Sequence, residues 1–247
     1  MRKYLWVAAS GVLAVLVYAQ ISAGQLLANY AKALGDAKSL KVSYTVQPLD
    51  GAPAAYQLDF AKPNLAKIET PTEIITADGS HIIRYDKAQK TYYKEPQTDE
   101  ALRSLVSADE LGIWSAFFNG QAFAKASAKS LGTFNRKGMQ VQGVEASFDE
   151  GKKKVVYYLA VQDNLARQAE IGYADRGSSD KLLVNAKSIE IGADPKPEQY
   201  AFKAPEGSRE LTESERMSAV WFDDLEAAKA EAAKTKRLIF IDFYAEW

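Results

Sequence analysis

Side chains that could perform chemistry are scarce in this chain, and this limits the reactions to consider. There is no cysteine, which excludes a disulfide, a thiolate metal site and a catalytic thiol. There is one histidine, His81, so a zinc site built from several histidines is excluded. His81 follows a turn signal, and we expect a solvated or hydrogen-bonded residue at a strand end. No catalytic residue, metal ligand or cofactor site is predicted.

Other polar groups have structural interpretations. Ser107 opens the pattern Ser-Ala-Asp-Glu of a capping box, so its hydroxyl is expected to bind backbone at a helix start. Asp223 and Asp224 lie at the start of a predicted helix, where carboxylates interact favourably with the helix dipole. Lys152–Lys154 is a run of charge in a turn, and we expect all three lysines to be solvated.

The remaining candidate site is a group of aromatic and apolar residues spread over several predicted elements. Such residues could line an apolar cavity that receives a ligand, or they could pack the core, and the sequence leaves both possibilities open. The aromatic helix among these elements could likewise plug the core or act as a movable lid. The candidate ligand-lining residues are Tyr56, Leu58, Phe60, Tyr85, Trp114, Phe117, Phe118 and Tyr157.

Composition and charge exclude some classes of partner. The formal charge is −1, with 47% apolar and 26% charged residues, as in ordinary globular proteins. So small a net charge gives no support for binding to nucleic acid or to an anionic membrane surface. No glycine-rich phosphate loop follows a predicted strand, so nucleotide binding is not expected.

The elements that must position the aromatic residues are mostly short strands. The segment Tyr56–Pro96 is typical of a meander, because Tyr56, Leu58 and Phe60 alternate with polar or small residues. Asp78-Gly79 is a hairpin signal between two apolar runs. Strands this closely spaced leave no room for crossover helices, so their pairing must be antiparallel.

Further strands are predicted on both sides of this meander. Lys38–Gln47 alternates, and Thr133–Ile191 contains several apolar runs separated by turns. Within it, Val155–Val161 is apolar on both faces and should be a central strand covered on both sides. Roughly ten antiparallel strands would curl around their interior.

Helices are expected to cover one face of this sheet. Ser22–Ala37 carries one apolar stripe and is capped by Ser22. The capping box at Ser107 predicts an aromatic helix that ends at Asn119-Gly120, and alanine-rich Gln121–Ser130 predicts another. The predicted fold class is therefore α+β, a strongly curved antiparallel sheet covered by helices.

The two ends of the chain carry different signals. Residues 1–19 combine a positive start, an uncharged apolar run and a small-residue cleavage site, which predicts a signal peptide. The run is shorter than the roughly 20 residues of a spanning helix, although an uncleaved leader would tether the protein to the membrane. Polar residues 208–220 predict a linker. A helix over Phe222–Thr235 and an apolar strand over Leu238–Ala245 predict the start of a second, α/β domain.

Residues of about 25–207 resemble the periplasmic lipoprotein carriers, the LolA-like and LolB-like proteins. The resemblance rests on FAKPNLAKIET (Phe60–Thr70), ADGSHIIRYDKAQKTYYKEP (Ala77–Pro96) and EQYAFKAPEGSREL (Glu198–Leu211). It implies that residues 20–207 form a half-open β-barrel whose helices act as a lid over an apolar cavity. In that family an arginine before the proline is implicated in lid closure. Lys62 stands at that position here as the lid-contact candidate, without the planar guanidinium of arginine.

This resemblance also implies a function. It indicates a non-catalytic, periplasmic or secreted binding domain that shelters a lipid acyl chain or a lipoprotein, with another periplasmic protein as a further partner. Neither nucleic acid nor a metal is implied.

Residues of about 221–247 resemble the start of a thioredoxin-like domain through LIFIDFYAEW. In that family Cys-x-x-Cys follows, which implies a truncated β/α stub here and a longer parent protein. Thiol-disulfide exchange needs a thiolate, so this chain cannot perform it. An alternative function is therefore that of a fragment of a periplasmic thiol-disulfide oxidoreductase, in which the LolA-like region is a docking or tether domain.

Overall fold

The computed structural model describes residues 21–107, 109–174, 181–192, 194–217 and 222–235, together with 239 and 241. The predicted signal peptide lies outside these residues, as does nearly all of the predicted strand Leu238–Ala245. None of the described helices is long and apolar enough to cross a membrane.

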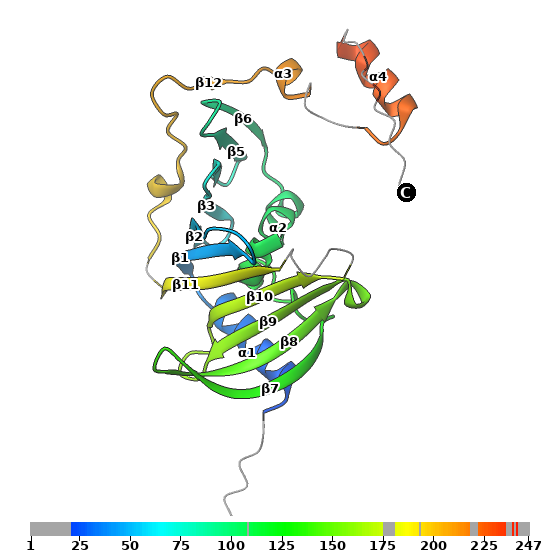
Figure 1. The fold of residues 1–247 in the computed structure, drawn as a ribbon. Helices are drawn as coiled ribbons and strands as arrows, with labels where there is room; N and C mark the ends of the chain where they lie inside the picture. Colours follow the sequence, from blue (N-terminus) through cyan, green and yellow to red (C-terminus); the bar gives the residue numbers. More distant parts are fainter. Residues whose placement is uncertain are drawn as a thin grey trace, which may run out of the picture.

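A curved sheet of 12 strands organises the chain (Figure 1). Its spatial order is β12-β6-β5-β4-β3-β2-β1-β11-β10-β9-β8-β7, and the sheet stays open because β7 and β12 form its two edges. Neighbouring strands are antiparallel except β12, which runs parallel to β6. The strands are β1 (Ser39–Pro48), β2 (Ala54–Ala61), β3 (Leu65–Glu69), β4 (Glu73–Ala77), β5 (His81–Asp86), β6 (Thr91–Pro96), β7 (Ser127–Arg136), β8 (Met139–Phe148), β9 (Lys153–Ala160), β10 (Ala166–Tyr173), β11 (Leu182–Ile191) and β12 (Arg209–Glu210).

Two meanders meet at one seam within this sheet. Strands β1 to β6 follow each other in space as they do in sequence, and so do β7 to β11. The two series are joined by the pairing of β1 with β11, in which Leu40 lies opposite Ile191. A register shift between Ser43 and Tyr44 interrupts this pairing, and such a bulge increases the local twist. The predicted fold class, a strongly curved antiparallel sheet covered by helices, is confirmed.

Alternation along the strands produces an apolar inner face. On one side of the seam Val42 pairs with Leu58 and Tyr44 with Tyr56. On the other side Tyr157 of β9 pairs with Val144 and Ala169; all three are buried in the same core. Burial of this face supplies the main driving force for folding.

Helices cover the inner face (Figure 1). The helical cover, as we call it, consists of α1 (Ala23–Gly35), α2 (Asp99–Ser107), the 3-10 helix η1 (Asp109–Phe117) and the turns that follow to residue 126. Leu27 of α1, Leu105 of α2 and Trp114 of η1 belong to one core with the strands. Three short 3-10 or α-helices, η2 (Asp149–Gly151), η4 (Pro197–Tyr200) and α3 (Glu213–Met217), and the longer α4 (Leu225–Thr235) lie elsewhere in the chain.

A strap formed by residues 196–211 crosses the outer face of the first meander. The buried Tyr200 hydroxyl donates to the Asp59 carboxylate of β2. The ring centroid of Phe202 lies 4.9 Å from that of Tyr92 in β6. Within the predicted linker 208–220, β12 pairs with β6 and α3 follows.

Of the two predicted caps at helix starts, one is confirmed and one is wrong. The cap of α1 is confirmed, because the Ser22 hydroxyl accepts the Gln25 N–H at 3.1 Å. The capping box at Ser107 is wrong: the Ser107 hydroxyl donates to the Arg103 carbonyl of the preceding turn at 2.6 Å. A 3-10 helix follows in place of the predicted α-helix. Of the two acids predicted at the start of the last helix, Asp224 accepts two backbone N–H groups at the start of α4.

The alanine-rich helix predicted over Gln121–Ser130 is also wrong. Residues 120–125 form turns, and β7 begins at Ser127. Within β7, Ala128 lies opposite Ala146 of β8. Pairing with a neighbouring strand overrides the helical propensity of alanine at these positions.

Candidate functional site

The predicted lining residues occupy three places. Tyr56, Leu58 and Phe60 lie on the inner face of β2, and Trp114, Phe117 and Phe118 lie in or beside η1 above them. Within this first aromatic group, Phe60 is 5.8 Å from Phe117 and 5.2 Å from Phe118 between ring centroids. The structure therefore brings six of the eight predicted residues together. Burial is nearly complete for five of the eight, Leu58, Phe60, Trp114, Phe117 and Tyr157, with 0 or 1% of the surface exposed.

Tyr157 belongs to a second aromatic group under the other end of the cover. Its ring centroid lies 5.7 Å from that of Tyr30 in α1 and 5.6 Å from that of Phe123. Tyr30 and Phe123 stack at 5.5 Å with an interplanar angle of 10°. The Tyr30 hydroxyl donates to the Ile113 carbonyl at 2.8 Å, which fixes η1 to α1.

Tyr85 does not join either group. It pairs with Ile74 and Tyr92, the residues of β4 and β6 that face away from the helical cover. Although Tyr85 is buried, it lies outside the core formed by the cover and the inner face. The prediction that Tyr85 lines the same cavity as the other residues is therefore wrong. Strand β5 has buried apolar residues on both faces, Ile82 on the inner face and Ile83 and Tyr85 on the outer face, which lies near the strap.

Lys62 contacts the helical cover as predicted. Its ammonium group donates to the carbonyl of Gly35 at the end of α1. The same ammonium lies 5.2 Å from the centroid of the Phe117 ring, within the range of a cation–π interaction. A positive charge is favourable at a helix C-terminus, so Lys62 holds α1 and η1 against the end of β2.

Two buried hydrogen-bond donors in the first aromatic group lack a partner. Among the described residues, the Tyr44 hydroxyl and the Trp114 indole N–H bind no acceptor. Their rings lie 6.0 Å apart, and both side chains are almost fully buried. Each unsatisfied buried group costs about 1–3 kcal/mol. These two donors are therefore available to an acceptor that enters between η1 and β1.

Replacing Tyr44 by phenylalanine should stabilise the ligand-free protein. The change removes the unsatisfied hydroxyl and keeps the ring that packs on Tyr56 and Trp114. We expect the free energy of unfolding to rise by about 1–2 kcal/mol in a urea titration. A decrease of similar size would mean that the hydroxyl is hydrogen-bonded in the folded protein.

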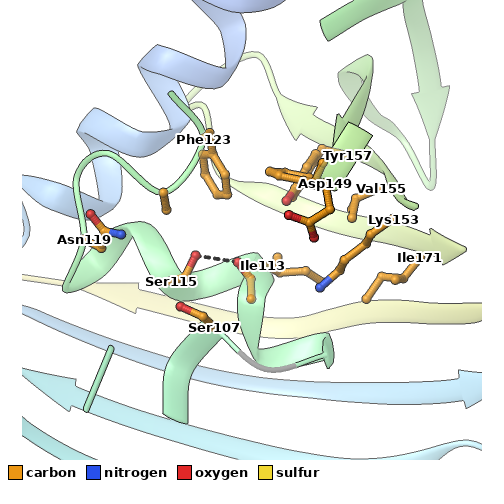
Figure 2. Close-up of a pocket in the computed structure, with 13 residues that line it drawn as sticks. Ser107, Ile113, Ser115, Asn119, Phe123, Asp149, Lys153, Val155, Tyr157 and Ile171 are labelled. Carbon is orange, nitrogen blue, oxygen red and sulfur yellow. Dashed lines mark hydrogen bonds between the residues drawn. The ribbon is translucent and has the colours of Figure 1, made fainter. Parts of the chain in front are cut away.

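The second aromatic group borders a pocket of about 190 Å³, shown in Figure 2. Its apolar walls come from β8, β9 and β10 on the sheet side and from Ile113 and Phe123 in the cover. Polar groups also line it, and they come from several elements. The lining residues are Ser107, Gly112, Ile113, Ser115, Asn119, Ala122, Phe123, Phe148, Asp149, Lys153, Val155, Tyr157 and Ile171.

Lys153 is the functional candidate that sequence reasoning missed. The run Lys152–Lys154 is not uniformly solvated, because Lys153 is half-buried and lines this pocket while Lys152 and Lys154 are exposed. Lys153 pairs with Phe148 and Tyr173 on the inner face. The signal was present in the sequence, since Lys153 shares the alternation of Val155 and Tyr157.

Burial keeps the tyrosines of the site neutral. Desolvation raises the pKa of Tyr30 well above 10, and the neighbouring Tyr157 adds to the shift. Desolvation alone raises the pKa of Tyr157. For Tyr44, desolvation is the largest cause of a raised pKa, followed by the negative charge of Glu110. These hydroxyls therefore act as hydrogen-bonding groups and cannot serve as bases at neutral pH.

Other candidate chemistry finds no support. His81 is exposed at the start of β5 on the outer face, as expected for a solvated residue. The described residues contain no group of three or more histidine, cysteine, aspartate or glutamate side chains that could hold a metal ion.

Comparisons with known proteins agree with the fold. No family model and no curated protein sequence matches the chain. Among solved structures, an uncharacterized conserved protein from Thermus thermophilus aligns with a TM-score of 0.50 and 8% identity, over 76% of this chain and 96% of that one. At this identity the similarity concerns the fold alone.

Two further solved structures align more loosely. MucB has a TM-score of 0.46 and 12% identity over 74% of this chain, and the chain spans 63% of the MucB chain. The LolA superfamily protein NE2245 from Nitrosomonas europaea has a TM-score of 0.35 and 10% identity, over 74% of this chain and 98% of that one.

Proposed function

We propose that this chain is an exported, non-catalytic binding domain that shelters the acyl chain of a lipid or lipoprotein between its curved sheet and its helical cover. The observation that carries the proposal is the construction of the interior. An apolar inner face is closed by a separate helical layer, and that layer holds Trp114 against Tyr44 of β1 and its two phenylalanine neighbours against Phe60 of β2. The pattern of residues 1–19 supports export.

The pocket beside Tyr157 is too small for a long acyl chain unless the cover moves. Sites for drug-sized ligands measure about 300–1,000 Å³, whereas the pocket beside Tyr157 measures about 190 Å³. At this end of the cover, a long acyl chain therefore fits only if the aromatic residues of η1 leave the inner face. In this proposal the structure corresponds to the closed state, and the ligand replaces the contacts of Trp114 with β1 and those of Phe117 and Phe118 with β2.

Apolar contacts supply most of the attachment between cover and sheet in this closed state. Lys62 provides a polar contact to the Gly35 carbonyl at one end, whereas Tyr30 binds Ile113 within the cover itself. An acyl chain can replace apolar contacts without leaving polar groups unsatisfied. An entering ester or amide carbonyl would also satisfy the unpaired hydroxyl of Tyr44.

Single cysteines provide a direct test, because the chain has none of its own. Ala116 of η1 and Ala160 of β9 are both buried, at 0 and 1% exposure. Ala160 lies on the outer face, opposite Val141. We expect Ala116→Cys to react slowly with a thiol reagent in the free protein and roughly tenfold faster with a saturating fluorescent fatty acid, because a cover that is open most of the time exposes position 116. Ala160→Cys should stay protected in both conditions.

The binding measurement itself is a titration of the folded wild-type protein with the same fluorescent fatty acid, for which we expect one site per chain. Absence of binding would refute the proposal. Reaction of both cysteines after ligand addition would indicate general unfolding by the amphiphile, and it would count against a specific movement of the cover.

A further inference from the structure

We infer that the free edge of β7 binds an extended acidic segment of another protein, which adds one strand to the sheet. Figure 1 shows β7 at the rim of the sheet, so this surface is separate from the interior that the proposed function uses. Strand addition requires an exposed strand whose backbone groups have no partner on one side, together with side chains that select the incoming segment.

Strand β7 is the long free edge among the described strands. It spans ten residues and pairs with β8 alone, whereas the opposite edge of the sheet, β12, is two residues long. Among the described residues, no backbone group outside β8 bonds to the backbone of Ser127–Arg136. Very short edge strands limit pairing with other chains, so β7 is the edge that can accept a further strand.

The hairpin between β7 and β8 determines which backbone groups face outward. Its turn, Lys137-Gly138, has positive φ at both residues, 51° and 80°, so Arg136 and Met139 close the hairpin as a hydrogen-bonded pair. Hydrogen-bonded and non-hydrogen-bonded pairs alternate along an antiparallel ladder. Thr133 and Asn135 therefore direct their N–H and C=O groups to the free edge, and both residues are exposed.

A bulge limits the regular part of this edge. The register between β7 and β8 shifts between Ser130 and Gly132, which leaves Gly132–Arg136 as a regular run. Bulges and lysines at an edge are common devices against unselective pairing. A partner strand is therefore short, and its charge must suit the lysines of this edge.

The charges along the edge are positive. Residues 111–144 contain four basic residues and no acidic one. Lys125, Lys129 and Lys137 are exposed, and within the described part of the chain they form no ion pair or hydrogen bond through their side chains. The fourth, Arg136, donates to the Gln168 side chain at 2.8 Å. The three lysines are therefore the charges that a partner can use.

This charge favours an acidic segment over a second copy of the chain. Glu145 of β8 lies opposite Lys129 and offsets part of the positive charge. A second copy would bring the same lysines to the edge, and like charges on paired strands are destabilising. A segment with acidic residues at both ends places them near Lys129 and Lys137, which stand on either side of the regular run.

Phe134 provides an apolar contact beside the outward-facing backbone groups. It lies on the outer face opposite Val141 and is 37% exposed. Its ring packs over β8, because a Cβ atom on Gly143 would lie 2.7 Å from the ring. The edge of β7 therefore stays unobstructed. A β-branched residue in the middle of the partner segment suits this position, since aromatic and β-branched residues pair favourably across strands.

The test is fluorescence anisotropy of a labelled peptide, Glu-Glu-Thr-Val-Thr-Val-Thr-Glu-Glu, with the folded full chain. We expect saturable binding that weakens as salt is added. Replacing the glutamates by glutamines should weaken binding about threefold to tenfold. N-methylation of all the central peptide nitrogens removes the donors that face β7, and it should weaken binding about tenfold or more.

Variants of the chain test the same edge from the other side. Thr133→Pro removes an outward N–H and keeps the bonds to β8, so we expect about tenfold weaker binding or more. Thr133→Val is its matched control and should bind as the wild type does. If Thr133→Pro does not fold in a urea titration, the N-methylated peptide on the wild type decides the same question.

The role of charge has its own pair of variants. Lys129→Gln combined with Lys137→Asn should weaken binding about threefold to tenfold and reduce its salt dependence; asparagine suits the positive φ at position 137. Lys41→Gln combined with Lys187→Gln removes the same charge from exposed positions on β1 and β11, in the middle of the sheet. This control should keep the wild-type affinity.

Several outcomes would overturn the inference. Undiminished binding of the N-methylated peptide, or an equal loss in the two lysine pairs, would mean attraction by charge alone. Absence of binding would exclude the site. A dimer in light scattering that Thr133→Pro dissociates would assign the edge to a second copy. Each of these results leaves the proposed function intact, because that function is judged by the long-chain ligand and the cysteine at position 116.

Discussion

Replacing Trp114 by alanine is expected to destabilise the free protein and to tighten its binding of a long acyl chain. Truncation of a buried tryptophan costs about 3–5 kcal/mol, and Trp114 is 1% exposed. Removing its unsatisfied indole N–H returns part of that cost, about 1–3 kcal/mol. We therefore expect a net loss of about 2–3 kcal/mol in the free energy of unfolding, measured by urea titration.

The expected gain in affinity for the acyl chain follows from the proposal that the cover is closed in the ligand-free protein. If η1 must leave the inner face before the ligand enters, the apparent dissociation constant is the intrinsic one divided by the open fraction. Weakening the attachment of η1 raises that fraction. If Trp114 instead lined the bound ligand, its truncation would weaken binding, so the sign of the change separates a plug from a lining residue.

Tyr200→Ala is the matched control for this experiment. Tyr200 is as buried as Trp114 but lies on the outer face, where its hydroxyl binds Asp59. The control should lose a similar amount of stability and keep the wild-type affinity for the fluorescent fatty acid. A parallel change of affinity in both variants would show that general destabilisation is the cause.

Raising the pH above about 10 should unfold the protein over a narrow range. Burial raises the folded-state pKa of Tyr30, Tyr44 and Tyr157 above the value near 10 that an unfolded chain has. The stability associated with these groups is complete below about pH 10 and falls as pH rises toward the folded pKa, because only the unfolded state releases the protons.

The expected loss of stability at high pH is large compared with the free energy of unfolding of an ordinary domain. Each group contributes about 1.4 kcal/mol per pH unit, so three groups give roughly 4 kcal/mol per unit. Domains are stable by about 5–15 kcal/mol, so unfolding should be complete about one to four pH units above 10. Tyrosinate absorbance and far-ultraviolet circular dichroism should change together, and Tyr157→Phe should reduce the slope by about 1.4 kcal/mol per pH unit. Full tyrosine ionisation with an unchanged dichroism spectrum would contradict this prediction.

The alternation of apolar and polar residues predicted the strands well, because this pattern arises wherever a sheet has one buried and one exposed face. The run Tyr56, Leu58 and Phe60 lies on the inner face of β2, as predicted. Tyr85 was misplaced because both faces of β5 are buried, the outer one near a strap that lies far along the chain. Sequence periodicity carries no information about which layer a doubly buried strand residue contacts.

Predictions from local helix propensity were wrong where contacts with distant segments decide the structure. The alanine-rich segment became β7 because β8 pairs with it, and Ser107 closed a helix instead of opening one. Lys153 was overlooked for a related reason. A cluster of lysines suggested solvent, although the strand period places the middle lysine on the inner face with Tyr157.

The seam between β1 and β11 has a consequence for the order of folding. Each meander can form from hairpins that are local in sequence. The sheet becomes continuous only when β1 pairs with β11, which places Leu40 opposite Ile191. Closing a loop about ten times longer than a short one costs about 2 kcal/mol more in chain entropy, and distant pairings slow folding. The rate-limiting step should therefore be the docking of two preformed halves, and until it occurs one edge of β1 has no strand beside it.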